Sequence, residues 1–109
     1  MANTFKLKTK ANVGVTTVGI YTAPAATTTV VIGITMANTS GSGVNVGVGI
    51  TRGGPTEDVK LLKNAPIPQG SSLEFMSGNK IVLEATDTVT VDSDTNNSVD
   101  AALTIMEIT

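Results

Sequence analysis

The sequence contains no cysteine, histidine or tryptophan in its 109 residues, and its only aromatic residues are Phe5, Tyr21 and Phe75. Without cysteine, the chain has neither a disulfide nor a thiolate nucleophile. Without histidine, it lacks the commonest metal ligand and the side chain that most often acts as a general base at neutral pH. The absence of cysteine fits a reducing cytosol, or an assembly that spends time both inside and outside cells. The composition therefore favours a structural or binding module that is not an enzyme and holds no cofactor.

Positive charge is also scarce, since the formal net charge is −2 and the sequence pI is about 4.8. Nucleic-acid binders gain most of their affinity by neutralising phosphates, so we expect no nucleic-acid partner. No run of 18 apolar residues is present, so we expect no membrane-spanning helix. The one run of basic residues is Lys6, Lys8 and Lys10. In a β-strand these three side chains would lie on one face, and those of Phe5 and Leu7 on the other. We expect a solvated face of an edge strand or a flexible arm there; the alternative is an anionic contact on a partner.

The residues that are present alternate in polarity with a period of two, which is typical of β-strands. Residues 44–51 alternate valine and isoleucine with asparagine, glycine and threonine, which indicates a half-buried strand. Residues 30–37 carry no charge on either face, so we expect that strand to be central, covered on its second side, or both. Its faces are predicted as Val30, Ile32, Ile34 and Met36 against Val31, Gly33, Thr35 and Ala37. Residues 99–108 have Val99, Ala101, Leu103 and Ile105 on one face and Asp100, Ala102, Thr104, Met106 and Ile108 on the other.

The other expected strands are short and are separated by turn residues. These strands are Thr4–Lys10, Thr17–Thr22, Asp58–Lys63, Ser72–Met76, Lys80–Glu84 and 88–92. The turns are Ala23–Ala25, Asn38–Gly43, Gly53–Pro55, Ala65–Gly70, Ser77–Asn79 and Asp92–Asn97. Residues 56–63 are also compatible with a short helix capped by Thr56. Eight or nine short strands predict an all-β fold, an antiparallel β-sandwich that is jelly-roll or Ig-like. We expect residues 1–15 to form an N-terminal arm or edge strand, and 16–109 the β-sandwich domain.

The C-terminal strand keeps apolar residues on both faces almost to Thr109. An apolar strand face needs cover, either from this subunit's second sheet or from another subunit. We therefore select Met106 and Ile108, together with Phe5 and Leu7 of the N-terminal segment, as interface candidates. The alternative is that all four belong to the ordinary core.

One segment has the spacing of a metal site, because Asp92, Asp94 and Asn96 place oxygen atoms at alternate positions. Calcium loops use such ligands, but an EF-hand has glycine where Asn97 stands and glutamate where Leu103 stands. A turn stabilised by its own polar side chains is the simpler interpretation. Hydrolysis by paired carboxylates would need an aromatic platform for the substrate, which the sequence does not provide. The carboxylates that could otherwise serve are Glu57, Asp58, Glu74, Glu84, Asp87 and Glu107. Serine hydrolysis is also not expected, because the chain has no histidine to act as the base.

Several segments together resemble small virion structural proteins of tailed bacteriophages, particularly of marine phages. The resemblance rests on Ile20–Ala25, Val31–Ile34 with Ala37–Thr39, Lys63–Leu73, Lys80–Ala85 with Asp87, and Ser98–Asp100 leading into Met106–Thr109. Thr86 departs from the glycine of that pattern, so we expect another conformation for its turn. The resemblance implies a β-sandwich that works as an oligomer, and it implies no catalytic residue.

These observations favour a virion structural protein, assembled in the host cytoplasm. Within that class we expect a capsid decoration or cement subunit that binds the assembled shell. Its partners would be further copies of itself and other virion proteins, such as the major capsid protein. The alternatives are a tail, neck or baseplate component that anchors fibres, and a host-surface binding module that uses the loops Gly53–Glu57 and Asp92–Asn97.

Overall fold

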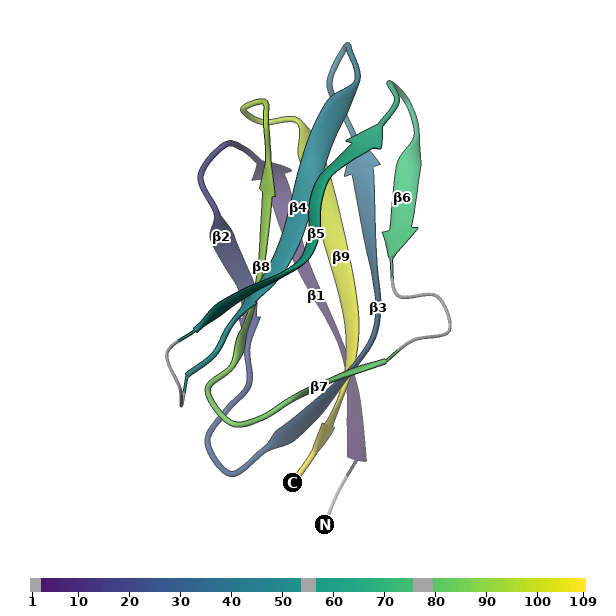
Figure 1. Cartoon of the computed structure of the whole chain (residues 1–109). Helices are drawn as coiled ribbons and strands as arrows, with labels where there is room; N and C mark the ends of the chain where they lie inside the picture. Colours follow the sequence, from purple (N-terminus) through teal and green to yellow (C-terminus); the bar gives the residue numbers. More distant parts are fainter. Residues whose placement is uncertain (1–2, 54–56, 76–79) are drawn as a thin grey trace.

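The computed structural model describes residues 3–53, 57–75 and 80–109, and within them nine β-strands form two antiparallel sheets (Figure 1). No described residue is helical. The strands are, in chain order, β1 (Asn3–Val13), β2 (Val18–Thr22), β3 (Thr28–Asn38), β4 (Val44–Thr51), β5 (Asp58–Ile67), β6 (Ser72–Phe75), β7 (Ile81–Leu83), β8 (Thr88–Ser93) and β9 (Val99–Ile108). The predicted all-β antiparallel sandwich is confirmed.

The strand order shows which sandwich this is. Sheet A has the order β1-β9-β3-β6, with β7 also paired to β3, and sheet B has the order β2-β8-β4-β5. β6 and β7 pair with successive parts of β3, so they act as two pieces of one edge strand. The first strand then pairs with the last, the second with the one before the last, and so on inward to β4 and β5. This nested pairing is that of a jelly roll. In an Ig-like sandwich the first two strands are neighbours in one sheet, which they are not here.

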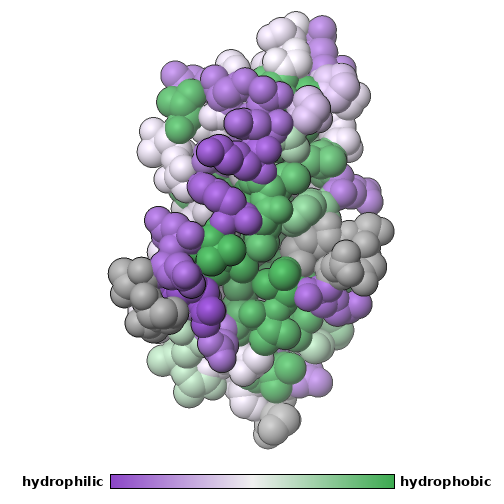
Figure 2. All heavy atoms as spheres, viewed as in Figure 1, coloured by the Kyte–Doolittle hydropathy of each residue, from purple (hydrophilic) through white to green (hydrophobic). Residues whose placement is uncertain are grey.

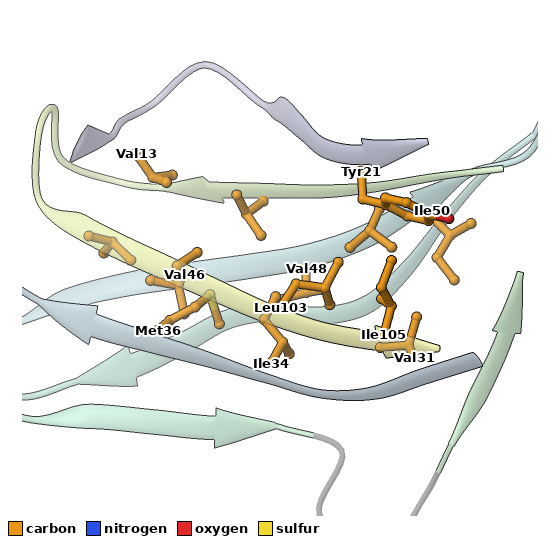
Figure 3. Close-up of a cluster of buried hydrophobic side chains, with 14 of the residues drawn as sticks. Val13, Tyr21, Val31, Ile34, Met36, Val46, Val48, Ile50, Leu103 and Ile105 are labelled. Carbon is orange, nitrogen blue, oxygen red and sulfur yellow. The ribbon is translucent and has the colours of Figure 1, made fainter. Parts of the chain in front are cut away.

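The core lies between the two sheets and consists almost entirely of aliphatic side chains (Figure 3). Leu103 and Ile105 of β9 are fully buried and belong to the same cluster as Val46 and Val48 of sheet B. The predicted inward residues of 44–51 and 99–108 are buried, which confirms these faces. Burial alternates along β9, whereas in β4 the glycines of the other face, Gly47 and Gly49, are buried as well. Because each buried aliphatic side chain contributes about 1.5–3 kcal/mol, this layer provides most of the stabilising energy.

The predicted faces of 30–37 are wrong in the first half of the strand. A β-bulge shifts the register of β3 against β9 between Val31 and Gly33. Val31 is consequently buried on the same side as Ile34, whereas Val30 is only partly buried and pairs with Met106 on the outer side. A bulge inserts one residue, so strict alternation changes side at that point.

The strand interpretation of Asp58–Lys63 is confirmed, but the predicted turn Ala65–Gly70 begins too early. β5 continues to Ile67, and Pro66 lies opposite Asn45 of β4. Proline is compatible with this position because β5 is the edge strand of sheet B, where one side of the backbone needs no partner. The predicted turns at Gly53–Pro55 and Ser77–Asn79, the strand end Met76 and the helix cap Thr56 lie partly or wholly outside the described residues.

The turn before Asp87 differs from the expectation for Thr86. Thr86 has φ = 70°, the left-handed conformation that a glycine favours, so the threonine keeps the backbone that a glycine would give. A Cβ on Gly53 would overlap the Thr86 hydroxyl, Cβ and carbonyl oxygen, so this close approach requires glycine at position 53.

Both ends of the described chain lie at the same end of the sandwich (Figure 1). They meet because Asn3 of β1 lies directly opposite Ile108 of β9.

Candidate assembly interface

The outward side of sheet A carries almost no charge. By register, the only charged side chains on this face of the described strands are Asp100 and Glu74, and the other outward positions are small or apolar. The outward side of sheet B is polar instead, with Asn45, Thr90 and Asp92 among its members. The two exposed faces of the sandwich are therefore chemically different.

The four predicted interface residues all lie on this outer face of sheet A. Phe5 and Leu7 of β1 are 68% and 65% exposed, while Met106 and Ile108 of β9 are partly buried. Phe5 lies directly opposite Met106, so the structure brings the N-terminal and C-terminal candidates together. None of the four points into the core between the sheets.

An apolar row extends beyond these four residues. Met106 lies opposite Val30 of β3, and Val30 lies opposite Val82 of β7, which is 58% exposed. Phe5, Met106, Val30 and Val82 therefore cross sheet A from its first edge to its last. Sequence reasoning missed Val30 because of the β3 bulge, and it missed Val82 because the pairing of β7 with β3 is not visible in the sequence.

The three lysines of β1 lie on the opposite side from this row. Lys6, Lys8 and Lys10 are opposite Ile105, Leu103 and Ala101, whose side chains are buried in the core. Lysines on the inner side of an edge strand discourage pairing with a further strand. Their aliphatic stems can still cover the margin of the core while the ammonium groups reach water.

The other sheet edges are also protected against pairing. β2, β6 and β7 have only five, four and three residues. β5 carries Pro66, and its pairing with β4 is interrupted by register shifts. Because the edges are protected and the outer face of sheet A is not, this face is the stronger candidate for a contact with another protein.

A second apolar surface lies on the open side of the sandwich, between β5 and β7. Figure 2 shows this side as a band of hydrophobic residues with hydrophilic residues at its margins. Part of this side is a groove of about 340 Å³ lined by Ile50, Val59, Ile81 and Val82 and by the charged residues Arg52, Glu84 and Asp87.

These charged residues form a compact ion cluster. The Arg52 guanidinium donates to Asp87 Oδ1 over 3.0 Å and also pairs with Glu84. Burial opposes ionisation of Asp87, but the backbone N–H groups of Glu84 and Gly53 and the Arg52 guanidinium outweigh it. Together they hold the pKa of Asp87 below its usual range. Every oxygen of this carboxylate is thus engaged in closing a turn, which indicates a structural role.

A second polar cluster lies inside the sandwich beneath the end of β9. The Tyr21 hydroxyl donates to Glu107 Oε2 over 2.6 Å, and Lys6 Nζ lies 2.9 Å from Glu107 Oε1. The Thr29 hydroxyl is 2.8 Å from the Tyr21 oxygen and is its donor, because the single Tyr21 proton goes to Glu107. The Tyr21 hydrogen bond and the one from Lys6 lower the pKa of Glu107. The cluster therefore connects β1, β2, β3 and β9 through one ionised carboxylate.

Tyr21 offers a direct measurement of this cluster. Burial, and then the hydrogen bond to Glu107, raise the pKa of Tyr21 to about 12. Since the chain has no other tyrosine and no tryptophan, near-ultraviolet absorbance reports this phenol alone. We expect an ionisation midpoint near 12 in the folded protein, and near the ordinary 10 in denaturant. Because the pKa is higher in the folded than in the unfolded state, the protonated Tyr21 contributes to the free energy of unfolding. This contribution is fully present below pH 10 and is lost as the pH rises towards 12. A folded-state midpoint of 10, with circular dichroism showing intact strands, would contradict the buried hydrogen bond.

The three oxygen-bearing side chains of the predicted metal candidate face different partners. Asp92 accepts from the Thr17 hydroxyl, Asp94 accepts from the Asn45 backbone N–H, and Asn96 accepts from the Val15 backbone N–H. Across residues 3–53, 57–75 and 80–109, no group of three histidine, cysteine, aspartate or glutamate side chains could hold a metal ion. The hydrogen bonds favour the turn interpretation of this loop. In the same described residues, no helix is long and apolar enough to cross a membrane.

Comparison with known proteins finds solved structures of similar fold. No family model and no curated protein matches the sequence. A subunit of Bacillus endospore appendages, which form disulfide-linked pili, superimposes with a TM-score of 0.57 at 17% identity, over 99% of this chain and 87% of that one. A chain of the cyanophage Pam1 capsid asymmetric unit gives 0.56 at 15% identity, over 95% and 85%. A chain of the infectious bursal disease virus particle gives 0.60 at 13% identity, over 96% of this chain but only 30% of that one.

The chain shares its fold with viral capsid and pilus subunits. The Pam1 and appendage chains are only a little longer than this one, so in both cases one jelly roll makes up most of a subunit. In the infectious bursal disease virus chain the same fold is one part of a longer polypeptide. These identities are low, so the likeness concerns the fold.

Proposed function

We propose that the protein is a non-enzymatic structural subunit of a virion, and that it decorates or cements the assembled capsid shell. The outer face of sheet A, which has few charges and carries the apolar row Phe5, Met106, Val30 and Val82, is the observation that supports this proposal. Contiguous apolar patches on a protein surface mark interaction sites. The jelly roll shared with a phage capsid chain of similar length supports a virion as the setting.

The size of this face suits a stable contact. β1, β9 and β3 have 11, 10 and 11 residues, and the last edge is formed by the 4 residues of β6 and the 3 of β7. At about 3.3 Å per residue and about 4.8 Å between strands, the face spans roughly 600 Å². A standard protein–protein contact buries about 800 Å² on each partner. A protein that binds the assembled shell but not its free subunits stabilises the shell by mass action. The shell partner would be the major capsid protein, and neighbouring copies of this chain would complete the layer, assembled in the host cytoplasm.

The substitution Ile108→Asp tests this proposal. Ile108 is partly buried on the outer face, so we expect the monomer to remain folded. Binding to purified shells should fall at least about tenfold, because an unpaired carboxylate is costly to bury in an apolar contact. Thr51→Asp is the matched control, because it adds the same charge on the exposed outer side of sheet B. Cosedimentation with shells measures binding, and thermal melting measures the fold.

Two results would overturn the proposal. Equal binding by both variants would exclude this face, and an unfolded Ile108→Asp monomer would show that the residue is internal.

The number of copies in a purified virion separates the related functions. Hundreds of copies support decoration, whereas a dozen or fewer support a tail, neck or baseplate component. Retained binding to host cells by the isolated protein would favour a host-surface binding module.

A further inference from the structure

The first eight described residues of β1 are held by their backbone and not by core packing. No side chain from Asn3 to Lys10 is buried, although all eight residues pair with β9. The outward side chains Phe5 and Leu7 are exposed, and the inward ones are lysines. Removing this segment would therefore take no buried side chain out of the core.

The chain becomes firmly anchored only at Val13. Val13 is 1% exposed, lies opposite Val99, and its carbonyl accepts the Ser98 N–H over 3.1 Å. The Gly14 carbonyl accepts the Ser93 N–H over 2.9 Å immediately afterwards. Whatever happens to residues 3–12, these bonds keep Val13 and Gly14 attached to their own sandwich.

A bulge separates the anchored and the unanchored parts. The register of β1 against β9 shifts between Lys10 and Val13, and Asn12 has φ = 59° in the left-handed region. Its N–H donates to the Asp100 side chain and not to the strand ladder. A non-glycine residue with positive φ next to a short connection is a place where the chain can change direction. Asn12 therefore has the properties of a hinge.

The edge of β9 that residues 3–12 cover can be filled only by a strand with suitable side chains. If residues 3–12 leave, β9 becomes an unprotected edge of ten residues with apolar groups on both faces. Glu107, which is 7% exposed, also loses Lys6. A replacement strand must then bring a cation opposite the end of β9. Among the described strands, only β1 carries lysines at alternate positions, so the β1 segment of another copy matches this position in both register and charge.

We propose that residues 3–12 form an exchangeable arm, which leaves its own β9 and pairs with β9 of a second copy of this chain in the assembled form. The exchanged arm makes the same backbone pairs and the same Lys6–Glu107 contact as before, so exchange has a low cost, as in other domain-swapped proteins. Each exchange ties two subunits together through a strand. This inference does not depend on where in a virion the protein resides.

The cysteine-free chain allows a direct test. Leu7 of β1 and Thr104 of β9 are directly opposite, close enough for a disulfide between cysteines at these positions. The single variants Leu7→Cys and Thr104→Cys are mixed, refolded together at high concentration and oxidised, then separated by non-reducing electrophoresis. Arm exchange places one variant's cysteine opposite the other's, so we expect the mixed disulfide to exceed both self-disulfides severalfold.

Two other outcomes would overturn the proposal. Random collision gives the mixed disulfide and the two self-disulfides in the statistical ratio, and face-to-face stacking without exchange enriches a self-disulfide. The matched control pair is Thr35→Cys with Ala102→Cys, at opposite positions of β3 and β9, where neither strand is expected to exchange. This control should give only the statistical ratio. The double variant Leu7→Cys/Thr104→Cys, oxidised when dilute, should close within one chain and lose the ability to exchange, while thermal melting confirms its fold.

Discussion

The substitution Leu103→Ala should lower the free energy of unfolding by about 2–5 kcal/mol, the range measured for truncating a buried leucine to alanine. Leu103 lies in the middle of β9, is 0% exposed, and packs among side chains from both sheets (Figure 3). β9 is paired on both sides, by β1 and β3, so the surrounding backbone has little freedom to collapse into the space left behind. Urea unfolding followed by circular dichroism measures this loss.

The neighbouring substitution Thr104→Ala is the control for this experiment. Thr104 points outward from the same strand and is exposed, so we expect a change of no more than about 0.5 kcal/mol. Similar losses for the two variants would contradict the assignment of inward and outward faces on β9.

The substitution Glu107→Gln should remove much of the dependence of stability on acid pH. The lowered pKa of Glu107 means that its contribution is fully present above the ordinary value of 4.5, and is lost as the pH falls through the lower, folded-state pKa. At pH 7 we expect the variant to be less stable by about 1.5–3 kcal/mol, as for the loss of a hydrogen bond to a charged group. Because the glutamine does not titrate, the difference between the variant and the natural protein should narrow below pH 4.5.

Denaturant midpoints measured across pH 2–8 give this comparison. Glu74→Gln makes the same chemical change at an exposed position of β6, and we expect its curve to follow that of the natural protein. A Glu107→Gln curve parallel to the natural one over the whole range would show that this carboxylate is not the acid-sensitive group.

The sequence predicts the strands well where alternation is uninterrupted. The bounds expected for 44–51 and 99–108 agree with β4 and β9, and the inward faces of both strands are confirmed. The bulge in β3 and the continuation of β5 through Pro66 could not be predicted, because both depend on which strand lies alongside. Periodicity reports burial along one strand, whereas bulges and edges are properties of a pair of strands.

Two features of the candidate site were beyond the reach of local sequence patterns. The lysines of β1 are on the side of the strand that faces the second sheet, although they remain accessible to water, and its phenylalanine and leucine are on the outer face of sheet A. The register against β9 sets this orientation. The contact between Tyr21 and Glu107 joins residues 86 positions apart, and single-sequence reasoning gives no basis for pairing them. The four interface candidates lie on one face because β1 and β9 pair with Phe5 opposite Met106, and the sequence alone does not give this pairing.

The close approach of the two chain ends has a practical consequence. Because Asn3 lies opposite Ile108, a short linker from the last residue back to the first would allow a circular permutant with new ends in the exposed turn between β3 and β4. Such a permutant would keep every strand of the sandwich but would tether β1 at both of its ends. Peptides or domains fused to the natural termini would all project from the same end of the sandwich. A probe that must not obstruct this end is therefore better attached at the opposite end.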